Sequence, residues 1–274
     1  MAQSSYNVKD VYKDINTIDG YFYYKTLDGG GSVEHDNQSI YKYCPYFSAL
    51  KSGHCNNYLE RAMSGVINLL ENLEKYNLEY DKLAEYAILF LNYKLKQHPQ
   101  YKSTNLNNFY TNHIEKNKYY DKKIKDNGPT YKEIIYKKKD LMDIKEISKF
   151  NGLFSILCKL YNEIKNNKLD CKNYSNYPET FANKFEELNE DSNINGNISY
   201  SKLLSTLSDD YNNLKNIYDS NNSCNFPPLP KVKTPPSKLI PALSTFSVIP
   251  VFLGIAYKTI YKKKIKKSKE EIET

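Results

Sequence analysis

Residues 239–257 carry no charged side chain, although lysines stand on both sides of them, at Lys238 and Lys258. As an α-helix, a stretch of this length would span about 28 Å, close to the hydrocarbon core of a bilayer, which is about 30 Å thick. Pro241 and Pro250 are compatible with such a helix where neighbouring groups satisfy the freed carbonyls. A helix buried in a protein core is the alternative, but a core helix would not be followed at once by a lysine cluster. The stretch therefore predicts a single transmembrane helix, with the membrane as a partner.

The tail that follows, residues 258–274, contains seven Lys and three Glu, so it supplies +4 of the net charge of +7. Because the cytoplasmic flanks of membrane helices are enriched in Lys and Arg, the tail is expected in the cytosol and the body outside. The first twenty residues lack the apolar core of a cleaved secretory signal. A second topology therefore stays open, in which a tail-anchored chain keeps its body in the cytosol.

Between body and span, residues 226–238 contain five of the chain's eleven prolines. Proline-rich segments adopt the extended polyproline II conformation and act as semi-rigid spacers. The segment is therefore expected to be a stalk between the body, residues 1–225, and the membrane. The alternative is a ligand for an SH3-type domain, but a juxtamembrane spacer explains the position without a partner.

Upstream of the stalk, apolar residues recur with the spacing of helices. Residues 58–75 have one apolar face, formed by Leu59, Ala62, Met63, Val66, Ile67, Leu70 and Leu73. Residues 81–97 are apolar around most of their circumference, which predicts a central helix that ends before Pro99. Further helices are expected at 106–118, 129–140, 143–165, 178–190 and 199–218. Since no run alternates with period two for long enough to predict a strand, the body is expected to be one all-α helical bundle.

Five cysteines raise the question of the compartment in which the body folds. In an external body they are expected to form disulfides. Proximity in sequence suggests pairing Cys44 with Cys55 and Cys158 with Cys171, which leaves Cys224 unpaired. In a cytosolic body all five would be thiols, so their redox state separates the two topologies. Four glycosylation sequons, at Asn37, Asn173, Asn197 and Asn221, support an external body only weakly, because the chain is rich in asparagine.

Motifs for catalysis or cofactor binding are missing from the sequence. A metal site at Cys44, His54 and Cys55 is disfavoured, because adjacent His and Cys side chains do not easily point at one tetrahedral centre. Residues 28–32, Asp-Gly-Gly-Gly-Ser, lack the Lys-Ser/Thr of a phosphate-binding loop and are interpreted as a flexible loop. Since neither GxSxG nor HExxH occurs, we expect no enzyme, no cofactor and no metal. The single arginine, Arg61, also argues against a nucleic-acid partner.

The order of segments resembles a known family. It begins with IDGYF at residues 18–22 and YKYCPY at 41–46, which is followed by a second cysteine. It continues with EYAILFLNYKL at 85–95, FYTNHIE at 109–115 and KKKDLMDIKEISKFNGLFSILCKLYNEI at 137–164, and it closes with stalk, span and basic tail. This order resembles the Plasmodium interspersed repeat (PIR) proteins, in particular the yir/bir/cir branch of rodent malaria parasites.

The resemblance implies a non-enzymatic variant surface antigen of malaria-infected erythrocytes, with a helical, disulfide-bonded ectodomain. It implies display on the parasite surface or export to the infected cell, a role in antigenic variation, and a host-cell or serum protein as partner. Two positions depart from the family pattern. A cysteine near the N terminus is absent, which would leave Cys224 without a partner, and Phe90 stands where tryptophan is frequent. The alternative function is a tail-anchored intracellular membrane adaptor with a cytosolic body.

Overall fold

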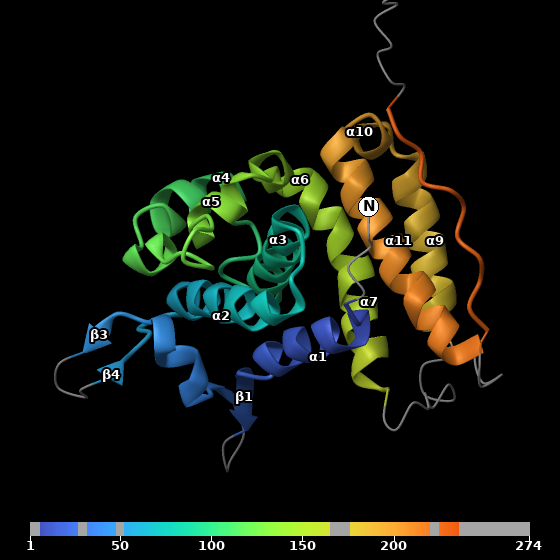
Figure 1. Ribbon diagram of the computed structural model, residues 1–274. Coiled ribbons are helices and arrows are strands. Elements are labelled where there is room, and N and C mark those ends of the chain that lie inside the picture. Colours follow the sequence, from blue (N-terminus) through green and yellow to red (C-terminus); the bar gives the residue numbers. More distant parts are fainter. Residues whose placement is uncertain (1–5, 27–31, 48–51, 165–175, 220–224, 236–274) are drawn as a thin grey trace, which may run out of the picture. The chain divides into compact units, whose positions relative to one another are not determined.

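The computed structural model describes residues 6–26, 32–47, 52–164, 176–219 and 225–235. These residues belong to one compact unit that extends to Pro235, and the remainder of the chain, from Pro236, forms a second unit. Figure 1 shows the described part, which is mostly helical. The expected span 239–257 and tail 258–274 lie outside the described residues. Within the described ranges, no helix is both long enough and apolar enough to cross a membrane.

The first half of the body is built on three helices, α1 (Val8–Asp19), α2 (Tyr58–Leu73) and α3 (Tyr80–Gln97). As expected for residues apolar on most sides, α3 is buried continuously from Leu83 to Leu95. It packs against α2 and against α5 (Tyr131–Tyr136), while α1 packs against α2. The central helix therefore buries apolar area on nearly every side, and such burial is the main source of folding free energy.

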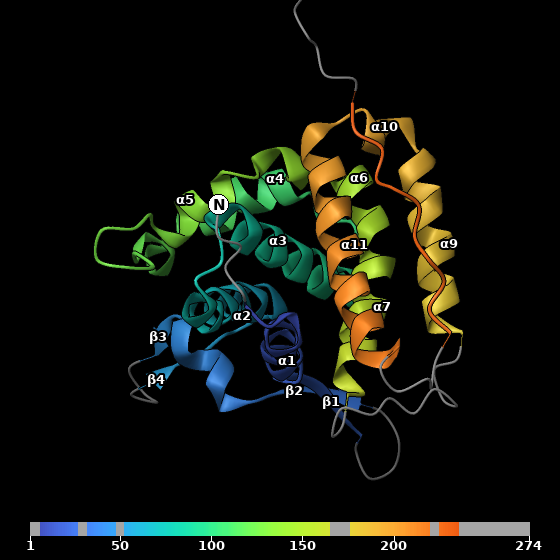
Figure 2. The same ribbon diagram turned by 45° about the vertical axis from the view of Figure 1, so that its right-hand side comes forward.

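The second half consists of α7 (Asn151–Asn162), α9 (Tyr177–Glu190) and α11 (Ile198–Asp219), which lie side by side in Figures 1 and 2. The short helix α10 (Ser192–Asn195) connects α9 to α11 at one end. Pro178 occupies the first turn of α9, where its missing N–H has no helical partner to lose. Because α7 also packs against α1 and α3, one hydrophobic core runs through both halves.

Asparagine, abundant in this chain, starts several of these helices. The side chains of Asn7, Asn57 and Asn105 accept hydrogen bonds from backbone N–H groups in the first turns of α1, α2 and α4 (Leu106–Phe109). Thr130 and Glu133 form a reciprocal capping box at the start of α5. Such caps satisfy N–H groups that have no partner within the helix, so they fix where each helix begins.

The all-α expectation is confirmed for most of the body but is wrong in detail, because the structure contains two short antiparallel hairpins. β1 (Phe22–Thr26) pairs with β2 (Ser32–Asp36), and β3 (Tyr46–Phe47) pairs with β4 (Ser52–Gly53). Aromatic residues favour strands, but a run such as Tyr-Phe-Tyr-Tyr hides the alternation of the two faces. Of the phosphate-loop-like residues 28–32, Ser32 begins β2 and the others lie outside the described ranges.

Three expected helices are interrupted. Residues 106–118 form α4, a π-helical turn η3 (Tyr110–Ile114) and the start of η4 (Lys118–Asp121). Residues 129–140 contain α5 and then η5 (Lys139–Met142), and residues 143–165 contain α6 (Ile144–Ile147), η6 (Ser148–Phe150) and α7. The remaining 3₁₀ turns are η1 (Gln38–Tyr43) and η2 (Glu74–Tyr76). Periodicity thus locates the apolar faces, whereas it overestimates the length of regular helix.

Candidate functional site

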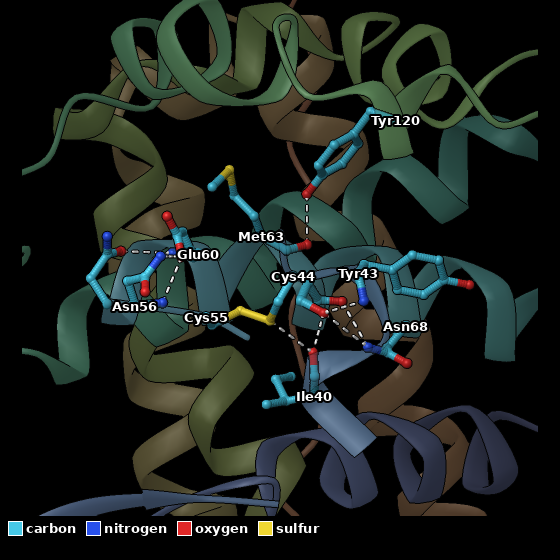
Figure 3. The surroundings of a disulfide bond; sticks show 11 residues. Ile40, Tyr43, Cys44, Cys55, Asn56, Glu60, Met63, Asn68 and Tyr120 are labelled. Carbon is cyan, nitrogen blue, oxygen red and sulfur yellow. Dashed lines mark hydrogen bonds between the residues drawn. A yellow bond between two sulfur atoms is a disulfide. The ribbon is translucent and has the colours of Figure 1, made fainter. Parts of the chain in front are cut away.

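The Cys44–Cys55 disulfide closes a surface loop between η1 and α2, which we call the stapled loop (residues 44–55). Figure 3 shows this bond and its surroundings. The two Cα atoms are 4.9 Å apart, and both cysteines are buried. This is the pair that proximity in sequence suggests. The bond ties the end of η1 to the residues that enter α2, so it holds the base of the loop in one position.

A close backbone contact shapes the stapled loop. A side chain at Gly53 would overlap the carbonyl oxygen of Tyr41, so only glycine allows β4 to approach η1 this closely. The N–H of His54 donates to the carbonyl of Pro45 at 2.9 Å, and this bond closes the β3–β4 ladder. The aromatic rings of Tyr41 and His54 lie 5.5 Å apart. Gly53 and His54 are therefore packed closely against η1.

A row of polar side chains along one face of α2 anchors η1. The hydroxyl of Ser64 donates to the carbonyl of Ile40 and accepts from the N–H of Tyr43 at 3.3 Å. Asn68, one turn further along, donates to the carbonyl of Ser64 at 2.9 Å. Figure 3 shows Ile40, Tyr43 and Asn68 close to the disulfide. Buried polar groups are costly unless they are paired. Here Ser64 holds the backbone of η1, and Asn68 is paired with Ser64 within α2.

Glu71 is the last residue of this row, and its carboxylate accepts hydrogen bonds from three donor groups. Its carboxylate oxygens lie 2.6 Å from the Lys42 ammonium, 2.6 Å from the Tyr43 hydroxyl and 3.1 Å from the Lys122 ammonium. Partial burial acts to raise the pKa of Glu71, but the hydrogen bonds from these three donors outweigh it and lower the pKa to about 2. A charged Glu71 thereby links α2 to η1 and to η4.

An open cleft of about 680 Å³ lies beside the stapled loop. It is lined by Gln38, Ser39, Tyr41 and Lys42 of η1, by Gly53 and His54, and by Asn68 of α2. Amide, hydroxyl and ammonium groups around one tyrosine ring suit hydrogen bonding and ring stacking with a polar partner. The cleft and the stapled loop together are the candidate binding site.

Ser64, Asn68 and Glu71 are not among the site residues expected from the sequence. The signal was present, because polar residues at spacings of four and three form one row along an otherwise apolar helix. Lys42 and Tyr43 carry no comparable signal, since their contact with Glu71 depends on how η1 returns to α2. Sequence patterns locate a row on one helix, but they do not show what lies across from it.

The second expected pair, Cys158 with Cys171, finds no support in the structure. Cys158 is a free thiol on α7 and is 3% exposed. It faces the core because α7 packs this side against α1, where Asn16 donates to the Cys158 carbonyl at 2.9 Å. Burial raises the pKa of this thiol well above its usual value. Cys171 and the expected unpaired Cys224 lie outside the described residues.

Neither metal binding nor proton transfer emerges from the described side chains. In the described ranges, no group of three or more His, Cys, Asp and Glu residues is placed to hold a metal ion. Cys55, which the disfavoured metal site would require, is engaged in the disulfide.

Comparison with known proteins gives two results. Residues 12–258 match the family described as Plasmodium variant antigen protein Cir/Yir/Bir. A solved structure described as "Structure of a Plasmodium PIR protein ectodomain" is similar, with 34% sequence identity and a TM-score of 0.61. The similarity covers 83% of the present chain and 99% of that chain. No curated protein sequence matches at a significant level.

Proposed function

The chain belongs to the Cir/Yir/Bir family of Plasmodium variant antigen proteins, and from this membership we propose that it is a surface antigen of malaria-infected erythrocytes. In this proposal the body is displayed outside the membrane, one span anchors it, and the basic tail lies in the cytosol. The protein acts by binding a host-cell or serum protein and by varying its exposed surface, without catalysis. The observation that carries the proposal is the family match, which extends from α1 through the expected span.

The disulfide supports the external topology. Disulfides form and persist in oxidising compartments and are rare in the cytosol. Cys44 and Cys55 lie at the base of a surface loop, and their bond shapes the cleft beside it. A body that depends on this bond suits the outside of the cell better than the cytosol.

The partner is proposed to bind at the stapled loop and its cleft. Loops held by a rigid scaffold are where recognition is commonly placed. Here the scaffold is α2, whose polar row fixes η1 from below. Side chains on the rim of the cleft, such as Gln38 and Ser39, can change without disturbing Ser64 or Glu71 beneath them. Such a division suits a surface that varies on a constant fold.

Surface labelling of intact infected erythrocytes tests the topology. An impermeant amine-reactive reagent should label lysines of the body, and external protease should digest it, while a cytosolic parasite protein in the same cells stays unlabelled. If the body is protected in intact cells and becomes accessible only after the membranes are opened, the surface-antigen proposal fails. Accessibility from the cytosol would then favour the tail-anchored adaptor.

A further inference from the structure

The proline-rich segment begins as part of the body. Residues 226–235, which we call the strap, run in an extended conformation along α9 and α11 (Figures 1 and 2). The strap starts beside the C-terminal end of α11 and finishes beside the C-terminal end of α9, near α10. A free spacer can therefore begin only after the strap, about ten residues later than the expected start at residue 226.

The first contact of the strap is aromatic. The ring of Phe226 stacks on Tyr218 with centroids 5.3 Å apart and planes 7° apart, and it lies 5.5 Å from the ring of Tyr211. Phe226 is 4% exposed, so it belongs to the core. The Tyr211 hydroxyl donates to the carbonyl of Pro227 at 3.0 Å. Burial of this apolar ring stabilises the docked segment and holds its first end against α11.

The last contact of the strap is polar. Asn189 on α9 is 1% exposed, and its side chain forms two hydrogen bonds with the backbone of the strap. Its amide nitrogen donates to the carbonyl of Lys231 at 3.0 Å, and its amide oxygen accepts from the N–H of Lys233 at 2.8 Å. The Lys233 ammonium also pairs with Glu190. Together these bonds hold the end of the strap at the C-terminal end of α9.

Between the two ends, every third residue faces the body. Phe226 is buried, and Leu229 and Val232 are partly buried against the core, whereas Pro228, Pro230 and Lys231 are exposed. A period of three is the repeat of the polyproline II helix. The prolines thus stiffen a segment whose apolar face already packs against α9 and α11. An SH3-type partner would first have to remove it from there.

The strap determines where the chain leaves the body. α11 has 22 residues and is about 33 Å long, and its N-terminal and C-terminal ends mark the two ends of this half of the body. Without strap contacts, the thirteen residues 226–238 would be a semi-rigid spacer of up to about 40 Å that starts at the C-terminal end of α11. With the strap docked, the chain from Pro235 to residue 239 reaches at most about 14 Å. That reach is too short to pass around to the other end.

We propose that the docked strap makes the α10 end of the body the end that faces a lipid surface, and turns the C-terminal end of α11 away from it. Asn189, Tyr211 and Tyr218 are the positioning residues. This inference rests on the proposed membrane anchor. The α10 end offers Ile198, which is 64% exposed, and the exposed Lys231 to the headgroup region, where apolar and cationic side chains are both accommodated.

Two labels on one helix test the orientation. Ile198→Cys and Asn216→Cys lie near opposite ends of α11, about 27 Å apart along its axis. The full chain, with Cys171→Ser and Cys224→Ser, carries a fluorophore at one position and is inserted into phosphatidylcholine vesicles that contain a lipid with a nitroxide headgroup. We expect quenching several-fold stronger at residue 198. Equal quenching at the two positions, or stronger quenching at residue 216, overturns the proposal.

Flotation of the vesicles separates this inference from its premise. If the chain does not float with the vesicles, the single-span anchor and with it the proposed function fail. If the chain floats but the two labels are quenched equally, only the orientation fails. Each result therefore decides one of the two statements.

Strap variants test the cause of the orientation. In Asn189→Ala, the amide of Lys233 should exchange hydrogen as fast as that of an exposed peptide. Quenching at residues 198 and 216 should become equal. Asn213→Ala, which changes an exposed asparagine of α11 that donates only within its own helix, should do neither. Tyr211→Phe removes only the hydroxyl that binds Pro227, so it loosens the strap while leaving the core packed. If exchange and quenching in both strap variants equal those of the unchanged chain, the strap does not set the orientation.

Discussion

Asp210 is a fully buried carboxylate on α11, in the part of the body where four helices meet. Its oxygens accept hydrogen bonds from the hydroxyls of Tyr12 on α1, at 3.0 Å, and Tyr86 on α3, at 2.9 Å. Tyr161 on α7 donates to the Asp210 backbone carbonyl at 2.7 Å. Burial raises the pKa of Asp210 to about 6, although the charge of Lys82 and both tyrosine hydrogen bonds oppose the rise.

The raised pKa of Asp210 gives a stability that depends on pH. Between about pH 4 and 6 the folded state binds this proton more tightly than the unfolded state, so the free energy of unfolding falls as pH rises through that window. The difference amounts to about 3 kcal/mol at most. Asp210→Asn should abolish this contribution, as measured by urea unfolding at pH 4, 5, 6 and 7.

The control for this prediction is Asp126→Asn, because Asp126 is exposed and is not among the charges that act on Asp210. The control should keep the pH dependence of the unchanged chain. A pH dependence in Asp210→Asn equal to that of the control would show that Asp210 does not titrate in this window.

At the scale of elements, the stapled loop is the part whose geometry depends on one covalent bond. The disulfide joins residues 11 apart in sequence, and closing a loop of this size is worth about 3 kcal/mol in the chain-entropy account. The double variant Cys44→Ser/Cys55→Ser should lose roughly that free energy of unfolding. Protease should also cut within residues 44–55 before it cuts elsewhere in the body.

A parallel variant, Cys171→Ser/Cys224→Ser, leaves the stapled loop unchanged and serves as the comparison. If protease sensitivity at residues 44–55 does not differ between the two double variants, the loop is held by its hydrogen bonds alone.

Elements with one clear apolar face could be predicted from the sequence, and others could not. The helices α2, α3, α9 and α11 follow from apolar residues spaced by three and four. The same spacing is present in α1, where Val8, Val11, Tyr12, Ile15 and Ile18 are buried, but it was not identified as a helix. The β1–β2 hairpin was missed because tyrosine suits both the buried and the exposed face, so its alternation is weak.

The candidate site could be predicted only in part. Proximity suggests Cys44 with Cys55, which are bonded, and Cys158 with Cys171, of which Cys158 is a buried free thiol and Cys171 lies outside the described residues. The strap shows a further limit of sequence reasoning. The four prolines of the strap indicate an extended segment correctly, but the repeat of three formed by Phe226, Leu229 and Val232 had to be compared with polyproline II to predict that the segment docks.

At the scale of the whole body, one core connects the first helix to the strap. Buried residues from Val8 to Phe226 belong to the same hydrophobic cluster. A body with one core should unfold in a single cooperative transition. Cys158, buried in this core, reports on that transition because its thiol reacts only when the core opens.

This gives a prediction for a chain in which Cys171 and Cys224 are replaced by serine. Alkylation of Cys158 in increasing urea should follow the loss of helical circular dichroism, with the same midpoint. Alkylation at a clearly lower urea concentration would mean that α7 separates from the body before the rest unfolds.

The hydrogen bonds that hold the strap determine which of its residues can be substituted. The hydrogen bonds that Asn189 and Tyr211 form with the strap reach main-chain atoms, namely the carbonyls of Pro227 and Lys231 and the N–H of Lys233. Hydrogen bonds to the backbone do not distinguish one side chain from another. Substitutions at the outward-facing positions of the strap should therefore leave these hydrogen bonds in place.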